Sequence, residues 1–378
     1  MSTGNHNHST MISERLRNHK LSLPTFEQAS DVVRWFGAVQ AQEFQAAKWA
    51  LALRMRHSTN ATNAAVEAAF NRGEIVRTHL LRPTWHFVAP EDLRWLLQLT
   101  GPRVNQRCSS TYRKYELDSA VLKRSNRVLA KALKGGKQLT RSELKAVLNR
   151  AGVAADDTVR MAHILLRAEL DGVVCSGPRR GNQFTYALVE ERVPAGKQFD
   201  RDEALAELAR RYFSSHGPAT IADFVWWSGL TVKDARRVIE LLDREIEKIQ
   251  LGETVYLTAN TGRRSSNSMK RDDEAHLLPA YDEYNVAYKH RQLVFDRNAV
   301  SQITAWGALG PNVIVDGRIV GLWNGTIVRN SVEIEITPAR PLTRRERSAI
   351  TKAAERYAAF LGVPLAATHI QEHGFKKT

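Results

Sequence analysis

Two glutamines, Gln40 and Gln42, lie on either side of Ala41 in the stretch WFGAVQAQEFQAAKWALALR. Each amide side chain can accept a hydrogen bond through its oxygen and donate through its nitrogen, so a converging pair could orient a water molecule or a substrate. On a helix, residues i and i+2 lie about 200° apart, whereas on an extended segment they point the same way. The chemistry open to the two glutamines therefore depends on the local backbone conformation.

The residues around the glutamines predict two helices with a break between them. Thr25 and Gln28 have the spacing of a capping box, and apolar residues follow at helical intervals. Gly37 can end this first helix, and a second apolar pattern begins near Ala46. We therefore expect the glutamines to fall between the helices, with both amides facing one pocket. The alternative is one continuous helix from Phe26 to Leu53, with the glutamines on opposite faces.

The charge of the chain favours an anionic partner. The 378 residues include 55 Lys and Arg against 40 Asp and Glu, which gives a formal net charge of +15 and a pI of about 10.0. The segment from Gly101 to Arg150 contains 13 basic and 3 acidic residues, a local net charge of +10. Such an excess is typical of proteins that bind an anionic polymer or surface. The alternative is a solvated basic face without a partner.

Several classes of protein are not expected. The first ten residues, MSTGNHNHST, have no apolar core, so we expect a disordered tail over residues 1–10 and no signal peptide. No apolar run approaches the roughly 18 to 20 residues that span a bilayer, so no membrane partner is expected. The two cysteines, Cys108 and Cys175, are too few for a zinc cluster, and we expect no metal or other cofactor. A reduced protein of the cytoplasm, associated with the nucleoid, is the resulting expectation.

One order of elements recurs three times along the chain: helices, a short turn, another helix and a β-hairpin. In the second copy, Thr140 and Glu143 mark the start of a helix, Gly152 ends it, and a second helix runs from about Asp157 to Leu170. Two β-prone segments then flank the basic tip GPRRGN. This combination describes a winged helix, whose second helix and wing usually contact duplex DNA. Winged helices also mediate protein contacts, but the basic hairpin favours DNA.

We therefore predict an α+β protein in which three tandem winged-helix units are followed by a β-rich C-terminal domain with a terminal helix. The expected winged helices span residues 11–100, 101–198 and 199–260, and the C-terminal domain spans residues 261–378. The first and second wings carry the candidate DNA contacts, which are Arg77, His79, Arg82, His86, Arg179, Arg180 and Gln183.

The third copy carries an aromatic cluster. A short helix should end at Trp227, a long helix should start at Val232, and the strand ETVYLT should close the unit. Phe224, Trp226 and Trp227 have the spacing of a short buried helix. We therefore interpret the three aromatic residues as core residues and not as platforms for stacked bases.

The C-terminal region is rich in predicted strands. Asp316-Gly317 and Asn324-Gly325 have the sequence of two-residue hairpin turns. A final helix from about Arg344 to Leu361 should cover one face of the sheet. Asp282 and Glu283, at the start of this domain, are the main rivals of the glutamines as catalytic groups.

Five motifs make the sequence resemble a known family. They are AVQAQE, AAKWALALR, RTHLLRPTWHFVAPEDLRWLLQLTGPR, HGPATIADFVWWSGL and LLPAYDEY. In this order and spacing, over residues 10–365, they resemble the winged-helix DNA glycosylases typified by AlkZ. The resemblance implies three tandem winged helices and a β-rich C-terminal domain around a concave DNA-binding surface.

The resemblance also implies an activity. Members of this family excise N7-alkylated purines, and some unhook interstrand crosslinks made by bifunctional alkylating natural products, a form of antibiotic self-resistance. Their catalytic signature is a glutamine, an apolar residue and a second glutamine, which matches Gln40, Ala41 and Gln42. A sister subgroup has an acidic residue in the last position, and this chain departs from it. The expected partner is double-stranded DNA containing alkylated purines, bound by a monomer.

Two neutral amides suffice for such a reaction because of the leaving group. An N7-alkylated guanine or an N3-alkylated adenine is cationic and departs as a neutral base, so a general acid is unnecessary. The remaining task is to orient one water against C1′ of the sugar, which Gln40 and Gln42 can share. The motif offers no amine nucleophile for a Schiff base. We therefore expect a monofunctional, metal-independent glycosylase of base excision repair that leaves an abasic site.

Two other functions are open on the sequence alone. A DNA-binding transcriptional regulator without catalysis would need only the winged helices, and the glutamines would contact phosphates. An enzyme such as a nuclease could act through Asp282 or Glu283, and it would require a divalent metal.

Overall fold

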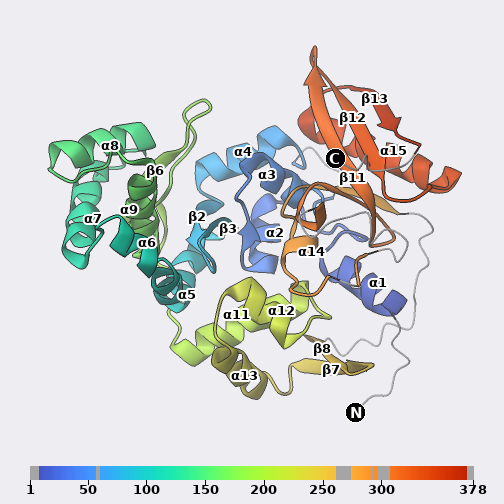
Figure 1. The fold of residues 1–378 in the computed structure, drawn as a ribbon, viewed down its shortest axis with the longest axis horizontal. Coiled ribbons are helices and arrows are strands. Elements are labelled where there is room, and N and C mark those ends of the chain that lie inside the picture. Colours follow the sequence, from blue (N-terminus) through green and yellow to red (C-terminus); the bar gives the residue numbers. More distant parts are fainter. Residues whose placement is uncertain (1–7, 57–59, 261–273, 292, 296–306, 373–378) are drawn as a thin grey trace.

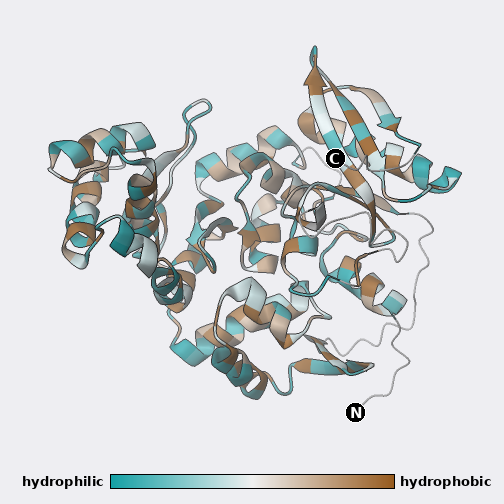
Figure 2. Ribbon diagram, viewed as in Figure 1, coloured by the Kyte–Doolittle hydropathy of each residue, from teal (hydrophilic) through white to brown (hydrophobic). Residues whose placement is uncertain are grey.

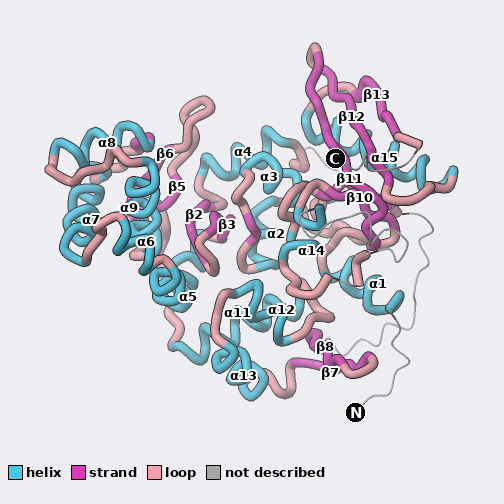
Figure 3. Tube along the Cα trace, in the orientation of Figure 1, coloured by secondary structure: helices cyan, strands magenta, loops and turns pink. Residues whose placement is uncertain are grey.

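The computed structural model describes residues 8–56, 60–260, 274–291, 293–295 and 307–372. Residues 1–7 of the expected tail lie outside the described residues, whereas residues 8–10 already belong to helix α1 (His8–Asn18). Helices and short sheets alternate along the whole chain, which gives a mixed α+β architecture (Figures 1 and 3). None of the helices in the described ranges is both long enough and apolar enough to cross a bilayer.

The helices on either side of the glutamines are separate, as predicted. Helix α2 (Ala29–Phe36) ends at Gly37, whose φ of +79° is accessible to glycine without strain. Strand β1 (Val39–Gln40) follows, and helix α3 (Phe44–Ala52) begins after the second glutamine. The alternative of one continuous helix is therefore wrong. The predicted capping box is also wrong, because the residue before α2 is Gln28 and its side chain makes no cap.

The first 100 residues combine a layer of helices with a three-stranded antiparallel sheet in the order β1-β3-β2. Alternate residues of an extended strand point to opposite faces. Val39 and Ala41 accordingly pack into an apolar core with α2 and α3, while Gln40 points away from it. The remaining elements of this region are α4 (Asn63–Arg72), β2 (Val76–Leu80), β3 (Thr84–Val88) and the short 3-10 helix η1 (Pro90–Asp92).

The second region repeats this topology and lies at the left of Figure 1. Its capping box between Thr140 and Glu143 and its helix start after Asp157 are confirmed. The three-stranded sheet has the order β4-β6-β5, which matches β1-β3-β2 of the first region. The elements are α5 (Leu93–Arg107), α6 (Ser109–Lys114), α7 (Ser119–Leu133), β4 (Leu139–Thr140), α8 (Arg141–Arg150), α9 (Thr158–Leu170), β5 (Val174–Ser176), β6 (Thr185–Leu188) and α10 (Val189–Arg192).

The third region follows the same order once more. It contains α11 (Arg201–Ser215), α12 (Ile221–Ser228), α13 (Val232–Leu241), β7 (Ile246–Leu251) and β8 (Thr254–Ala259). Ala219 forms an isolated bridge with Leu257 of β8, in the place that β1 and β4 occupy in the other two regions. The predicted long helix from Val232 stops at Leu241, and a two-stranded hairpin replaces the single predicted strand. Pairing of β7 with β8 around Gly252 overrides the helical tendency of the segment before it.

The C-terminal region is a five-stranded sheet in the order β13-β12-β11-β10-β9. The pairing is antiparallel except between β12 and β13, which run parallel. Helix α15 covers the sheet and has the predicted bounds. The elements are β9 (Ala275–Leu278), α14 (Glu283–Val286), the 3-10 helix η2 (Gly307–Leu309), β10 (Asn312–Val315), β11 (Arg318–Val328), β12 (Ser331–Pro338), α15 (Arg344–Leu361) and β13 (Leu365–Ile370).

One of the two predicted hairpin turns is correct. Asp316 and Gly317 have φ values of 48° and 77° and join β10 to β11. Asn324-Gly325 instead lies inside β11, paired with β12, so this prediction is wrong. The chain reverses later, between Val328 and Ser331. Packing explains the glycine at position 325, because a Cβ there would lie 3.2 Å from a ring carbon of Tyr357.

The apolar cores join the regions of the chain to one another. The hydrophobic face of α1 and residues of α3, among them Trp49, pack with the C-terminal sheet and α15. The second and third regions share another apolar cluster. Apolar residues occur in the helices and strands of all these regions, where they alternate with polar ones (Figure 2). The C-terminal sheet is thus built onto the first region, the one that carries the glutamines.

Candidate active site

The glutamine segment forms the edge strand of the first sheet. Strand β1 pairs with β3 in antiparallel register, with Gln40 opposite His86. The N–H of Ala41 continues the ladder and donates to the carbonyl of Trp85 at 2.8 Å. The backbone is therefore extended through the middle of the motif. On an extended segment the side chains of residues i and i+2, here Gln40 and Gln42, point to the same side.

The two glutamine side chains have different surroundings. Gln40 is buried, and its Oε1 accepts no hydrogen bond from any described residue. Gln42 is half-buried, and its Oε1 lies 3.5 Å from the N–H of Trp85, at the limit of hydrogen bonding. A buried polar atom in a folded protein normally has a partner, in the protein or in water. The oxygen of Gln40 is thus placed to accept a hydrogen bond from a molecule other than the protein.

Arg77 fixes the other side of the motif backbone. Its Nε donates to the carbonyl of Ala41 at 2.9 Å and its Nη2 donates to the carbonyl of Gln42 at 3.2 Å. The guanidinium carbon lies 4.2 Å from the ring centre of Trp85 and 4.7 Å from that of Phe184. Burial lowers the pKa of Arg77 to about 10, so the side chain is cationic at neutral pH. With 7% of its surface exposed, Arg77 serves the motif and is not a free DNA contact.

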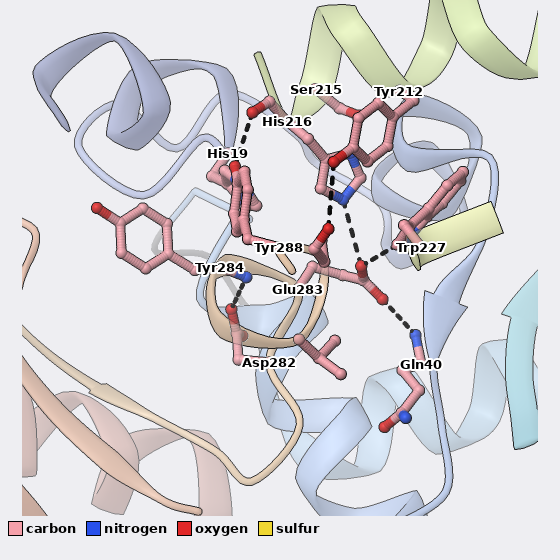
Figure 4. Close-up of polar contacts among 12 residues, drawn as sticks. His19, Gln40, Tyr212, Ser215, His216, Trp227, Asp282, Glu283, Tyr284 and Tyr288 are labelled. Atoms are coloured by element: carbon pink, nitrogen blue, oxygen red, sulfur yellow. Dashed lines mark hydrogen bonds and ion pairs between the residues drawn. The ribbon is translucent and has the colours of Figure 1, made fainter. Parts of the chain in front are cut away.

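Glu283 lies behind the backbone of Gln40. Its Oε1 accepts the N–H of Gln40 at 2.6 Å. Its Oε2 lies 3.0 Å from Nε1 of Trp227, which donates to it, and 3.2 Å from Nε2 of His216. The side chain of Gln40 extends away from this carboxylate (Figure 4). Gln40 and Glu283, the rival catalytic candidates of the sequence, thus belong to one hydrogen-bonded assembly with Trp227 and His216.

Asp282 is held by a different partner. The guanidinium of Arg54 donates to both of its carboxylate oxygens, at 2.8 and 2.9 Å, and the N–H of Tyr284 donates to Oδ1 at 2.9 Å. Asp282 and Arg54 are both buried, so the pair joins α3 to the C-terminal region without contact with solvent. Both carboxylates of the predicted nuclease pair are thus engaged by donors of the protein. In the described part of the chain, no group of three or more His, Cys, Asp or Glu side chains could hold a metal ion.

Arg82 and His86 lie next to this assembly with polar atoms that have no described partner. These atoms are Nε and Nη2 of Arg82 and Nε2 of His86. Nδ1 of His86 is 3.0 Å from the carbonyl of Thr84. Burial and the nearby charge of Arg82 lower the pKa of His86 to about 3, so its ring is neutral near pH 7. Both residues were predicted as DNA contacts. The unpaired atoms of Arg82 are donors, whereas Nε2 of the neutral His86 ring is an acceptor, because the ring hydrogen on Nδ1 is donated to Thr84.

Two of the other predicted DNA contacts are engaged inside the protein. His79 is buried and bonds through both its N–H and its Nδ1 to the carboxylate of Glu169. Arg179 lies 3.4 Å from Glu67 and packs over the ring of Phe44, with little surface exposed. His79 therefore lies inside the protein, because strand β2 is buried on both faces.

The hairpin between β5 and β6 presents the remaining two candidates. The side chain of Arg180 is largely exposed and donates to Glu143 at 2.9 Å and to the carbonyl of Gln138 at 2.7 Å. Gln183 is exposed, and its backbone pairs with that of Arg180 across the tip. Of the seven candidates, these two are the ones that lie on the surface.

The prediction that Trp226 is a core residue is wrong. Phe224 and Trp227 are buried, as predicted, but Trp226 is 40% exposed. Its Nε1 donates to the carbonyl of Val286, and the guanidinium carbon of Arg82 lies 5.6 Å from the centre of its ring. Three aromatic residues within four positions of an eight-residue helix cannot all face one core, which is the signal that could have identified the exposed one.

The fold agrees with what comparison with known proteins shows. The family model described as DNA glycosylase AlkZ-like matches residues 33–360. The chain therefore belongs to the AlkZ-like family of DNA glycosylases. This membership does not favour the alternative of a transcriptional regulator without catalysis.

Two comparisons with Streptomyces sahachiroi proteins extend this result. The chain is 28% identical over 375 residues to the interstrand DNA cross-link repair glycosylase of that organism, covering 92% of this chain and 95% of the relative. It is also similar to the solved structure of the S. sahachiroi DNA glycosylase AlkZ, with a TM-score of 0.80 and 23% identity, over 97% of this chain and 100% of that one. The fold is thus shared over almost the entire length.

Proposed function

We propose that this protein is a monofunctional DNA glycosylase that hydrolyses the N-glycosidic bond of cationic N7- or N3-alkylated purines in double-stranded DNA and leaves an abasic site. Gln40 and Gln42 jointly hold the water that attacks C1′. The alkylated base carries a positive charge before the bond breaks, so it departs neutral and needs no acid from the protein. The reaction needs no metal, and the enzyme acts on the DNA of the cytoplasm.

One observation carries this proposal. The buried Oε1 of Gln40 has no described protein partner, on a strand whose backbone is held by Trp85, Arg77 and Glu283. An amide oxygen that accepts a hydrogen bond from a water can align the lone pair of that water toward the sugar. A fixed backbone keeps the amide in place during the reaction, and positioning of this kind lowers the barrier of a bimolecular step.

The three repeated regions support a mode of DNA binding. We propose that each is a winged helix, in which helices precede a hairpin and a short strand or bridge adds to its second strand. Arg180 and Gln183 on the second hairpin are the surface contacts to phosphate. Arg82 and His86, beside the glutamines, contact the nucleotide under attack. The free N–H groups of Arg82 suit phosphate or sugar oxygens, and Nε2 of the neutral His86 ring can accept a hydrogen bond.

The proposed substrates include bulky adducts. The S. sahachiroi relative is named as an interstrand DNA cross-link repair glycosylase, and it matches this chain over nearly all of both sequences. We propose that this protein also unhooks interstrand crosslinks made through purine nitrogens. Each attachment at N7 produces the same cationic leaving group, so the chemistry at C1′ is unchanged.

The test uses a duplex with a single N7-methylguanine, incubated with and without EDTA and then cleaved with alkali. Strand breaks that do not depend on metal support the proposal. The variant Gln40→Ala with Gln42→Ala should bind the duplex and excise no base above background. Gln250→Ala, a change at an exposed glutamine of β7, is the matched control and should excise at the rate of the wild type. Undiminished excision by the double variant would contradict the assignment of the glutamines.

A further inference from the structure

We propose that Glu283 is a positioning residue for this reaction and that it supplies the negative charge that the two neutral glutamines lack. It holds the backbone of Gln40, and its field favours the positive charge that develops on the deoxyribose as the base departs. This inference rests on the proposed glycosylase function and adds a residue to it.

Three N–H donors from three parts of the chain surround the carboxylate of Glu283 (Figure 4). Oε1 faces the backbone of Gln40 on β1 at 2.6 Å, and Oε2 faces Trp227 of α12 at 3.0 Å and His216 at the end of α11 at 3.2 Å. Glu283 itself begins α14 and is almost completely buried. The C-terminal region and the third region therefore both reach the glutamine strand through this one side chain.

The carboxylate of Glu283 is ionised. Burial acts to raise the pKa of Glu283, but the hydrogen bond and the electrostatic interaction with His216, together with the hydrogen bond from the backbone of Gln40, outweigh it and lower that pKa below its ordinary value. Burial lowers the pKa of His216, so its ring is neutral and, with the hydrogen on Nε2, donates to the carboxylate. A neutral donor stabilises the anion without cancelling its charge.

No Lys or Arg within the described ranges forms an ion pair with Glu283. The neighbouring Asp282 takes the guanidinium of Arg54 with both its oxygens. Arg82 is a cation close enough to interact with Glu283, and its Nε and Nη2 have no partner among the described residues. When a DNA phosphate binds Arg82, the positive charge of Arg82 is offset and the negative charge of Glu283 acts on the sugar unopposed.

The chemistry of the step makes such a charge useful. The C1′–N bond breaks with its electron pair leaving on the base, and the sugar becomes cationic before the water adds and releases a proton to solvent. The base loses its positive charge in the same step. A fixed anion in a site shielded from water stabilises that cationic sugar because it needs no reorganisation when the charge appears.

The test compares two stable analogues of the abasic nucleotide in duplex DNA: a pyrrolidine, which is cationic, and a tetrahydrofuran, which is neutral. The wild type should bind the pyrrolidine duplex at least about tenfold more tightly. Glu283→Gln keeps an acceptor for the N–H of Gln40 but removes the charge. It should retain the affinity for tetrahydrofuran and lose about tenfold in affinity for pyrrolidine, about 1.4 kcal/mol. Glu346→Gln, a change at the buried carboxylate that caps α15, is the matched control and should keep the preference.

Two further measurements separate charge from folding. Glu283→Asp keeps the charge and should keep the preference for pyrrolidine, even if its shorter side chain lowers the melting temperature or slows excision. Loss of the preference in Glu283→Asp, or its retention in a folded Glu283→Gln, would overturn the inference. A wild type that excises N7-methylguanine but does not prefer pyrrolidine would overturn the inference alone. Absence of excision by the wild type would overturn the proposed function as well.

Discussion

Nε of Arg77 donates a hydrogen bond of 2.9 Å to the carbonyl oxygen of Ala41, the middle residue of the glutamine motif. On the other side of the same strand, Glu283 accepts the N–H of Gln40 at 2.6 Å. Two buried side chains of opposite charge therefore hold the main chain of the motif. The side chains of the glutamines are left free for chemistry, and the backbone that carries them is fixed.

Arg77→Lys should slow excision without weakening DNA binding. The ammonium of lysine cannot reproduce the planar fork that donates to two carbonyls and stacks on Trp85. We expect a fall of about tenfold to a hundredfold in the single-turnover rate on N7-methylguanine, equal to about 1.4 to 2.7 kcal/mol. Arg72→Lys, at an exposed pair with Glu74, is the control and should leave the rate unchanged. A lower salt slope of DNA binding in Arg77→Lys would instead restore the interpretation of Arg77 as a phosphate contact.

The charge of the lesion should decide the rate of excision. Without a general acid, the enzyme has no means to protonate a neutral leaving base, a contribution worth about 10² to 10⁴ in rate. We expect N7-methylguanine to be excised at least about 10²-fold faster than hypoxanthine, measured on matched duplexes under single-turnover conditions. Comparable rates on the two bases would show that the site contains an acid.

The two arginines of the second hairpin should respond differently to removal. Arg180 is exposed, so Arg180→Ala should weaken DNA binding and reduce the slope of log K against log salt by about one unit. Arg179 packs between Phe44, Phe184 and Glu67, so Arg179→Ala should lower the melting temperature and leave the salt slope nearly unchanged. Equal slope changes in the two variants would place Arg179 on the phosphate as well.

Asp282→Asn should destabilise the fold. It leaves the guanidinium of Arg54 buried beside a neutral side chain, and breaking one partner of a buried ion pair costs about 3 to 5 kcal/mol. Urea denaturation gives the free energy of unfolding. Asp202→Asn, a change in an exposed pair with Arg237, is the matched control and should lower this free energy by less than about 1 kcal/mol. A small effect of Asp282→Asn would mean that water reaches Arg54.

Stability should fall as the pH drops below about 6.5. The folded pKa of His86 is lowered to about 3, so between these values the unfolded chain binds a proton that the folded chain does not. The loss attributable to His86 is about 1.4 kcal/mol per pH unit within this window, as an upper figure. His86→Gln should remove this part of the slope between pH 6.5 and pH 5. Burial also lowers the pKa of His19 and of His216, which leaves a residual slope of the same sign. An unchanged slope in His86→Gln would mean that water reaches the ring.

Local signals in the sequence predicted most of the elements. The capping box at Thr140 and Glu143 needs no distant contact, because the side chains bond to backbone groups one turn away. The same holds for Asp316-Gly317, where both residues adopt the positive φ that the turn requires. Asn324-Gly325 has an equally good turn sequence, but pairing of the whole of β11 with β12 outweighs it.

The sequence predicted less about which candidates are exposed. Arg77, His79, Arg82 and His86 share one hairpin and look alike as a row of polar residues in strands. In the structure they differ in their partners: Arg77 packs against Phe184, His79 bonds to Glu169, and Arg82 lies over Trp226. Those partners lie 90 or more residues away in the chain. Basic character alone therefore cannot distinguish a phosphate contact from a buried cation that supports the motif.

The sequence by itself determined the glutamine motif, the break between two helices that exposes it and the order of the repeated units. Gly37 and the apolar spacing on either side are local properties, and they are sufficient for these features. Only the tertiary structure decided what holds the motif. Glu283 is 243 residues from Gln40 in the chain, and their 2.6 Å hydrogen bond exists because the C-terminal region packs onto the first one. No local pattern encodes such a contact, since it depends on which apolar faces are buried against each other.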